Sequence, residues 1–122
     1  MATYIEINNL KYPASITGRL NDKDWDDRES KAIKVEIPYS DAINIFVDDV
    51  KWNIVQDIEE SVEHIDEETG DIVYETLIRQ EVYDNSDYSI AGDIVDHRNG
   101  YVTIKMGKPT AKEILAMLEE VL

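Results

Sequence analysis

Residues 52–83 of this 122-residue chain read WNIVQDIEESVEHIDEETGDIVYETLIRQEVY, and their interpretation decides the fold. The second half, Ile72 to Tyr83, is rich in β-branched and aromatic residues and predicts a long strand. Residues 66–70, Asp-Glu-Glu-Thr-Gly, are typical of a five-residue hairpin loop with glycine at the position that needs a positive φ. The first half, Trp52 to Ile65, fits a helical period as well as a strand. The loop and strand that follow favour a strand, and hence one long hairpin.

Alternation of apolar and polar residues predicts further antiparallel strands on both sides of this hairpin. Asparagine tolerates a positive φ, so Asn8-Asn9 is predicted to be a two-residue turn, and Asn99-Gly100 is predicted to lie in another turn. The predicted strands are Tyr4–Ile7, Leu10–Tyr12, Ser15–Leu20 with Gly18 as a candidate bulge, Ala32–Ile37, Tyr88–Asp96 and Tyr101–Met106.

Two helices complete the prediction. Ser40 is expected to be the N-cap of a short helix from Asp41 to Asp48. Thr110 and Glu113 form a Thr-x-x-Glu capping box for a C-terminal helix with an apolar stripe, which we expect to be docked and not fraying. The predicted fold class is therefore α+β: residues 1–122 form a single β-rich domain of antiparallel hairpins with one short internal helix and a C-terminal helix.

The negative charge of the chain is concentrated in its middle. The sequence has 27 acidic and 12 basic residues, a formal net charge of -15. Fourteen acidic residues and one basic residue, Arg79, lie between Trp52 and His97, so this stretch carries -13. Such a field repels phosphate backbones and favours a basic protein or a cation. A protein partner is therefore expected, with no nucleic acid, and the lack of a long apolar run predicts no membrane span.

One loop has part of a calcium-binding pattern. Asp22, Asp24 and Asp26 stand at the first, third and fifth positions of a calcium loop. The pattern then fails, because Asp27 stands where the turn glycine belongs and Ile33 where the bidentate glutamate belongs. An ordinary solvated loop is the expected structure.

The remaining candidates for chemistry are incomplete. The chain has no cysteine, which excludes disulfides, thiolate nucleophiles and cysteine-based zinc sites. His64 and His97 each stand near carboxylates, but one histidine among carboxylates is a weak metal pattern. No nucleophile elbow or glycine-rich phosphate loop is present. We therefore expect no catalytic residue, no cofactor and no metal site, and a protein that is not an enzyme.

The predicted contact surface is the acidic hairpin from Trp52 to Tyr83. Like charges opposed across strands cost stability, and a partner's lysines and arginines, or bound cations, relieve that repulsion. The other interpretation, that the acids only keep the sheet edges soluble and unpaired, stays open. Trp25 is a further interface candidate because tryptophan is enriched at binding hot spots, whereas Trp52 is predicted to lie in the core. The candidate interface residues are Trp25, Asp57, Glu59, Glu63, Glu67, Glu68, Asp71 and Glu75.

Several short strings spread over most of the chain are similar to a known group of proteins. They are Tyr4–Pro13, Ile16–Arg19, Asp24–Arg28, Phe46–Ile54, Ala91–Gly100, and Met106–Thr110 followed by Glu113. Together they resemble small uncharacterised proteins encoded among the structural or tail genes of phages and prophages of Gram-positive bacteria. Asp49 stands where that family has a glycine. The family has no established activity, so the resemblance implies no catalytic residue.

The resemblance implies a phage-derived structural or tail-accessory protein that is not an enzyme and acts by protein-protein contact. Its partners would be phage structural proteins, and its location the cytoplasm of the host cell or the virion. The alternative is an acidic DNA mimic that occupies the DNA-binding groove of a basic host protein. Pairing with a second copy of the chain, as a homo-oligomer, is a further expectation.

Overall fold

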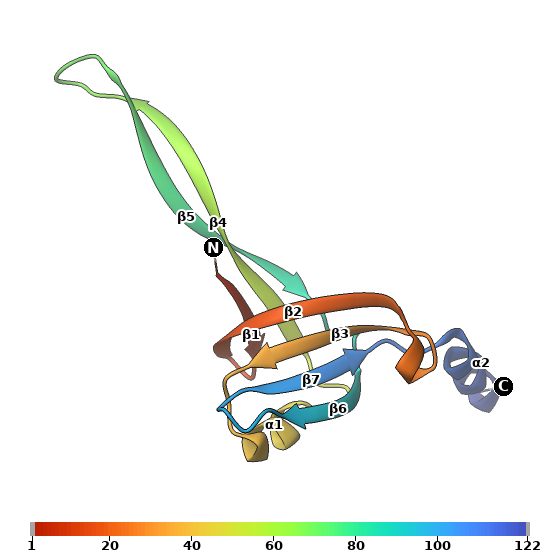
Figure 1. Cartoon of the computed structure of the whole chain (residues 1–122). Helices are drawn as coiled ribbons and strands as arrows, with labels where there is room; N and C mark the ends of the chain where they lie inside the picture. The colour runs from red at the N-terminus through yellow and green to blue at the C-terminus, as the bar shows by residue number, and fades with distance from the viewer. Residues whose placement is uncertain (1, 122) are drawn as a thin grey trace.

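Seven antiparallel strands form one sheet in the order β5-β4-β1-β2-β3-β7-β6, and two of them extend far beyond the rest (Figure 1). The computed structural model describes residues 2–121. The strands are β1 (Thr3–Ile7), β2 (Leu10–Asp22), β3 (Arg28–Val35), β4 (Trp52–Ile65), β5 (Ile72–Asp84), β6 (Ile90–Asp96) and β7 (Val102–Gly107). The helices are the 3-10 turn η1 (Lys23–Trp25), α1 (Tyr39–Ile45) and α2 (Ala111–Val121). The β-rich α+β prediction is confirmed.

Trp52 to Ile65 is a strand, as the hairpin interpretation favoured. Residues Trp52 to Gln56 of β4 pair with β1 on one side, and residues Asn53 to Ile65 pair with β5 on the other. Trp52 is 1% exposed, and its indole N–H donates to the Tyr88 carbonyl oxygen at 3.2 Å. Burial of this large ring therefore leaves no indole donor unsatisfied, which fixes the base of β4 in the core.

Turn residues adopt the conformations that their side chains allow. Asn8 and Asn9 have φ of 52° and 65° and join β1 to β2, which confirms the predicted asparagine turn. Gly100 has φ of 92° in the turn between β6 and β7. Asp49, the residue that stands in place of a glycine, has φ of 62°, so this aspartate adopts the left-handed conformation.

The core lies on one face of the sheet. Ile33 and Val35 of β3 lie opposite Ile104 and Val102 of β7, and all four side chains are at most 1% exposed. Helix α1 packs beside β6 and β7 and contributes Ala42, with the partly buried Ile45, to the core (Figure 1). Most of the core residues therefore lie outside the β4–β5 hairpin, which contributes Trp52 and Ile54 to this cluster.

Several predicted boundaries are wrong. Helix α1 begins at Tyr39 after Pro38, which makes no side-chain cap, so Ser40 is inside the helix and is not its N-cap. The helix also ends at Ile45, which leaves Val47 outside it. Strand β2 is continuous from Leu10 to Asp22, and its register with β3 runs unbroken through Gly18. The register shift lies between Arg19 and Asp22, so Gly18 is not a bulge.

Candidate functional site

The most unusual part of the molecule is the two-stranded ribbon formed by residues 57–80, called the arm below. Beyond the last pair between β1 and β4, Thr3 with Gln56, nine further cross-strand pairs from Asp57–Gln80 to Ile65–Ile72 extend away from the sheet (Figure 1). At about 3.3 Å per residue this ribbon is roughly 30 Å long. A two-stranded hairpin is marginally stable alone in water.

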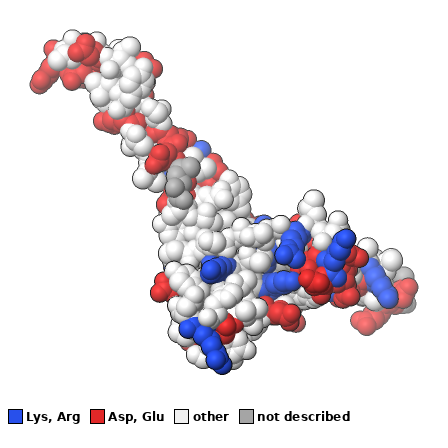
Figure 2. Space-filling view, in the orientation of Figure 1, with Lys and Arg blue, Asp and Glu red and all other residues white. Residues whose placement is uncertain are grey.

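The arm holds most of the predicted interface residues. Figure 2 shows acidic side chains along the arm to its tip, whereas the lysines and arginines visible in this view lie mainly on the body and on α2. Residues 57–80 contain nine acidic residues and one arginine, a net charge of -8. Seven of the eight predicted interface residues lie here: Asp57, Glu59, Glu63, Glu67, Glu68, Asp71 and Glu75.

The ribbon geometry divides these carboxylates between its two faces. Side chains alternate along a strand, so Asp57, Glu59 and Glu63 of β4 share one face, and Glu75, paired with Val62, lies on the other. Glu67 and Glu68 lie in the tip turn. The acids are thus gathered on one projection, but they do not form one flat acidic surface.

The arm satisfies part of its charge internally. Arg79 bonds through its guanidinium to Glu60 beside it on β4 and to Glu81 at 2.7 Å. The hydrogen bond to Glu60 makes the largest contribution to the raised pKa of Arg79. At the tip, the Asp66 carboxylate accepts from the Glu68 backbone N–H at 2.8 Å, and Gly70 takes a φ of 73°. The predicted glycine position in the loop is confirmed.

A polar network braces the base of the arm. The Asp57 carboxylate accepts from the Gln80 amide at 3.0 Å and from the Tyr4 hydroxyl at 3.4 Å. Lys11 of β2 donates to the Gln80 side-chain oxygen at 2.7 Å. These contacts join β4 and β5 to β1 and β2 where the ribbon leaves the sheet, so they hold the direction of the arm.

Exposed apolar side chains on the arm were not among the predicted site residues. Ile65 is 68% exposed, and Tyr74 and Ile78 are each 67% exposed. The signal was present in the sequence, because Ile72 to Tyr83 is rich in apolar residues, whereas the candidates predicted on the hairpin follow from charge. The exposed large apolar residues within the arm are Val62, Ile65, Ile72, Tyr74, Leu77 and Ile78.

Trp25 lies in the body, away from the arm, and contacts other parts of the chain. Its ring packs against Gly92 of β6 and Gly107 of β7, where an added Cβ would lie 2.6 Å and 2.8 Å from ring atoms. The buried Arg28 guanidinium lies 4.7 Å from the ring centroid, a cation-π geometry. The ring therefore packs within the fold, and an interface role for Trp25 stays a prediction.

Hydrogen bonds and an ion pair hold helix α2 at its first turn. The capping box is confirmed, because the Thr110 N–H donates to Glu113 at 2.9 Å and the Glu113 N–H donates to the Thr110 hydroxyl at 3.2 Å. Arg28 bonds the Glu113 carboxylate at 2.7 Å and, together with the Thr110 N–H, lowers the Glu113 pKa to about 2.

The expectation that the C-terminal helix is docked is wrong. Figure 1 shows α2 projecting from the body on the side opposite the arm. Four of its apolar side chains are between 47% and 60% exposed: Ile114, Leu115, Met117 and Leu118. An apolar stripe predicts that one face of a helix packs against another surface. The described part of the sheet does not bury this face of α2.

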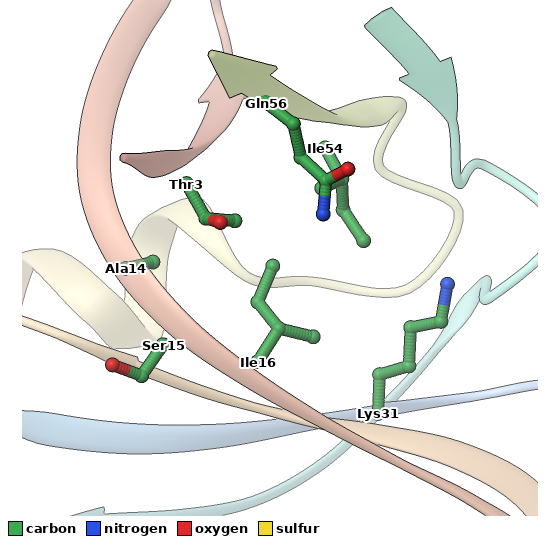
Figure 3. A pocket seen from close by; sticks show the side chains of 7 residues that line it. All are labelled: Thr3, Ala14, Ser15, Ile16, Lys31, Ile54 and Gln56. Atoms are coloured by element: carbon green, nitrogen blue, oxygen red, sulfur yellow. The ribbon is translucent and has the colours of Figure 1, made fainter. Parts of the chain in front are cut away.

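A groove lies beside the base of the arm. Two adjoining depressions of about 430 Å³ and about 450 Å³ share Lys31, Ile54 and Gln56 in their lining. Figure 3 shows the side chains of Ile16 and Gln56 directed into the first of them. Neither histidine of the chain is among the described residues that line this groove.

Lys31 is the basic residue that lines the groove, and its ammonium contacts other residues of the chain. Its ammonium donates to the Asn85 side-chain oxygen and lies 4.4 Å from the Tyr88 ring centroid. Burial lowers the Lys31 pKa. The chain thus already supplies this ammonium with one hydrogen-bond acceptor and one aromatic face.

The candidate metal residues are engaged elsewhere or lie apart. Asp22 is fully buried and accepts from Ser30 at 2.9 Å and from Lys105 at 3.0 Å, and the Lys105 bond is the first cause of its lowered pKa. His64 lies 3.8 Å from Glu75, and His97 lies 2.8 Å from the Thr103 hydroxyl. Within residues 2–121, no group of three histidine, aspartate or glutamate side chains is placed to hold a metal ion.

Comparison with models of known protein families, with curated proteins and with solved structures gave no match. Of the helices that the structure describes, none combines the length and the apolar character needed to cross a membrane.

Proposed function

We propose that this protein is a phage-derived structural or tail-accessory component that works by protein-protein contact, with the arm as its binding element. The observation that carries the proposal is the arm itself, a ribbon of nine strand pairs outside the core with exposed apolar residues along it. A ribbon of this kind is marginally stable alone, so contact with another protein would stabilise it. The sequence resemblance to phage structural and tail genes supports the particle as the setting.

The mixture of side chains on the arm favours a structural contact over DNA mimicry. A mimic presents carboxylates spaced like phosphates, whereas here the carboxylates lie on both faces and alternate with apolar residues such as Tyr74 and Ile78. Salt separates the two functions. Binding of a mimic to a basic protein would weaken steeply as ionic strength rises, and binding through apolar contacts would weaken less.

An arm-deleted variant tests the proposal. Gln56 and Glu81 face each other on β4 and β5, so an Asn-Gly turn between them can replace residues 57–80. The core lies outside the deleted segment, and cooperative thermal unfolding checks that the variant folds.

The intact protein and this variant are then expressed in the phage-carrying host, and particles are purified and analysed by mass spectrometry. We expect the intact protein in tail-containing particles and the variant in the soluble fraction only. Equal recovery of both in particles, or recovery of neither, would contradict the proposal.

A further inference from the structure

The outer edge of β5 is an open row of backbone hydrogen-bonding groups. The Asp66 N–H donates to the Asp71 oxygen at 2.8 Å, and the Asn85 N–H donates to the Trp52 oxygen at 2.9 Å. Bonded pairs recur at every second residue of an antiparallel ladder, so the odd-numbered residues of β5 bond β4. The even-numbered residues from 72 to 84 direct their N–H and C=O groups away from β4, where the described sheet has no further strand.

The side chains of those even-numbered residues form a row without charge over most of the strand. Their neighbours on the opposite face include Glu75 and Glu81, which project beside the same edge. The edge strand therefore offers a row of uncharged side chains on one face, with Asp57, Glu59 and Glu63 of β4 behind that row, and Glu75 and Glu81 on the other face. The uncharged row consists of Ile72, Tyr74, Thr76, Ile78, Gln80 and Val82.

The two edges of the sheet differ in protection. The other edge strand, β6, has seven residues, a register shift between Ala91 and Ile94, and contact with α1. Short, bulged or covered edges resist pairing with other chains. β5 has 13 residues and contains no proline or lysine, and no register shift interrupts its ladder with β4. Only its carboxylates oppose pairing, and they do so selectively, because they repel acidic strands.

We propose that the β5 edge accepts an extended segment of another protein in which apolar and basic residues alternate. The backbone of that segment would bond the outward groups of β5. Its apolar residues would lie along the uncharged row, and its lysines or arginines would lie opposite Glu75 and Glu81. This inference rests on the proposed function, and it names the partner chemistry of the arm.

Charge selects this partner over a second copy of the chain. Two arms side by side would each carry a net charge of -8, and their one arginine, Arg79, is already bonded to Glu60 and Glu81. A basic strand instead places lysines or arginines across from Glu75 and Glu81. Complementary charge thus gives the edge its specificity.

Amide hydrogen exchange with a defined peptide tests the inference. The probe is acetyl-Lys-Val-Lys-Thr-Lys-Val-Lys-amide, compared with the same peptide after every lysine is replaced by glutamate. With the lysine peptide we expect saturable binding and at least tenfold slower exchange at the even-numbered amides of β5, Ile72 to Val82. The odd-numbered amides, already bonded to β4, should change little, and the glutamate peptide should not bind.

Backbone variants of the peptide and of the protein separate strand pairing from simple charge attraction. N-methylation of one alternate set of peptide amides should weaken binding at least tenfold, and N-methylation of the other set should leave it unchanged. Thr76→Pro removes an outward donor without removing a bond to β4, and it should also weaken binding at least tenfold. Cross-strand contacts between β4 and β5 in the NMR spectrum confirm that the arm of this variant is formed.

Three results would overturn the inference. The first is peptide binding without protection of the even-numbered amides, which leaves the arm as a contact element and so leaves the proposed function intact. The second is equal effects of the two N-methylated peptides. The third is protection of the same amides without peptide, together with dimers in sedimentation, because a second copy would then occupy the edge. Absence of the protein from particles would instead contradict the proposed function.

Discussion

Substitution of Arg28 by alanine should release α2 and loosen the loop that carries Trp25. Arg28 is 5% exposed, and its guanidinium bonds the Lys108 carbonyl oxygen at 3.0 Å and the Glu113 carboxylate at 2.7 Å. It also stacks on Trp25. One side chain thus connects the start of β3 to the segment that leads into α2.

The expected loss of stability follows from these contacts. The hydrogen bond to the Lys108 carbonyl contributes about 1 kcal/mol, and the cation-π contact about 0.5 to 1 kcal/mol. Truncation of the buried methylene stem costs about 1 kcal/mol more. The buried Nε atom of Arg28 has no acceptor among the described residues, and its removal offsets part of this sum. Water reaches Glu113, so that pair is left out of the sum. The net effect is about 2 kcal/mol.

Urea denaturation of Arg28→Ala measures this difference, and amide exchange over residues 114–118 reports release of the helix. Arg19→Ala is the matched control, because the Arg19 side chain is 58% exposed and lies 3.8 Å from Asp22. Because Arg19 is exposed and the buried Asp22 keeps its bonds to Ser30 and Lys105, loss of this long contact should cost less than about 0.5 kcal/mol. If the two variants unfold at the same urea concentration, the assignment of Arg28 as the link to α2 is wrong.

Three further predictions concern Gly92, Glu113 and the arm. Gly92→Ala places a Cβ 2.6 Å from the Trp25 ring, so it should destabilise the fold by about 1 to 3 kcal/mol in thermal unfolding. Gly18→Ala is the control, because nothing lies within 4 Å of its added Cβ, and it should change stability by less than about 0.5 kcal/mol. The Glu113 pKa is lowered to about 2, so the stability that the ionised carboxylate contributes is present above the unfolded-state pKa near 4.5 and is lost as pH falls toward 2. Amide exchange of α2 should accelerate as pH falls through this range. Glu113→Gln should abolish this pH dependence. Gly70→Ala forces a side chain onto a φ of 73°, at a cost of about 1 kcal/mol, and should speed amide exchange near the arm tip about fivefold with little change in global unfolding. An equal change of exchange across the core would contradict the prediction that the arm opens independently of the core.

The sequence predicted the strands well because local chemistry determines them. Asn8-Asn9 and Gly70 stand where a positive φ is needed, and the strand from Ile72 gave Trp52–Ile65 a partner, which decided between strand and helix. The boundary errors come from competition between local signals. Ser40 is a better cap than Pro38 by side-chain chemistry, yet the fixed φ of proline lets the helix start directly after it.

The candidate site was predicted in part. Charge counting located the acidic residues of the arm, because acids close in sequence stay close on a hairpin. It missed the uncharged row on β5, whose importance depends on an edge that lies outermost in the sheet. Strand order is set by pairs such as Ile5 with Ile54, far apart in the chain, which no local pattern reports. The contact of Trp25 with Gly92 and Gly107 escaped prediction for the same reason.

The continuity of β4 has a mechanical consequence. The strand runs without a break from Trp52, inside the core, to Ile65 at the tip, so no flexible joint separates the two ends. A load applied at the tip would be carried along one backbone into the hydrogen bonds that β4 shares with β1. The orientation of the ribbon is therefore tied to the orientation of the sheet from which it projects.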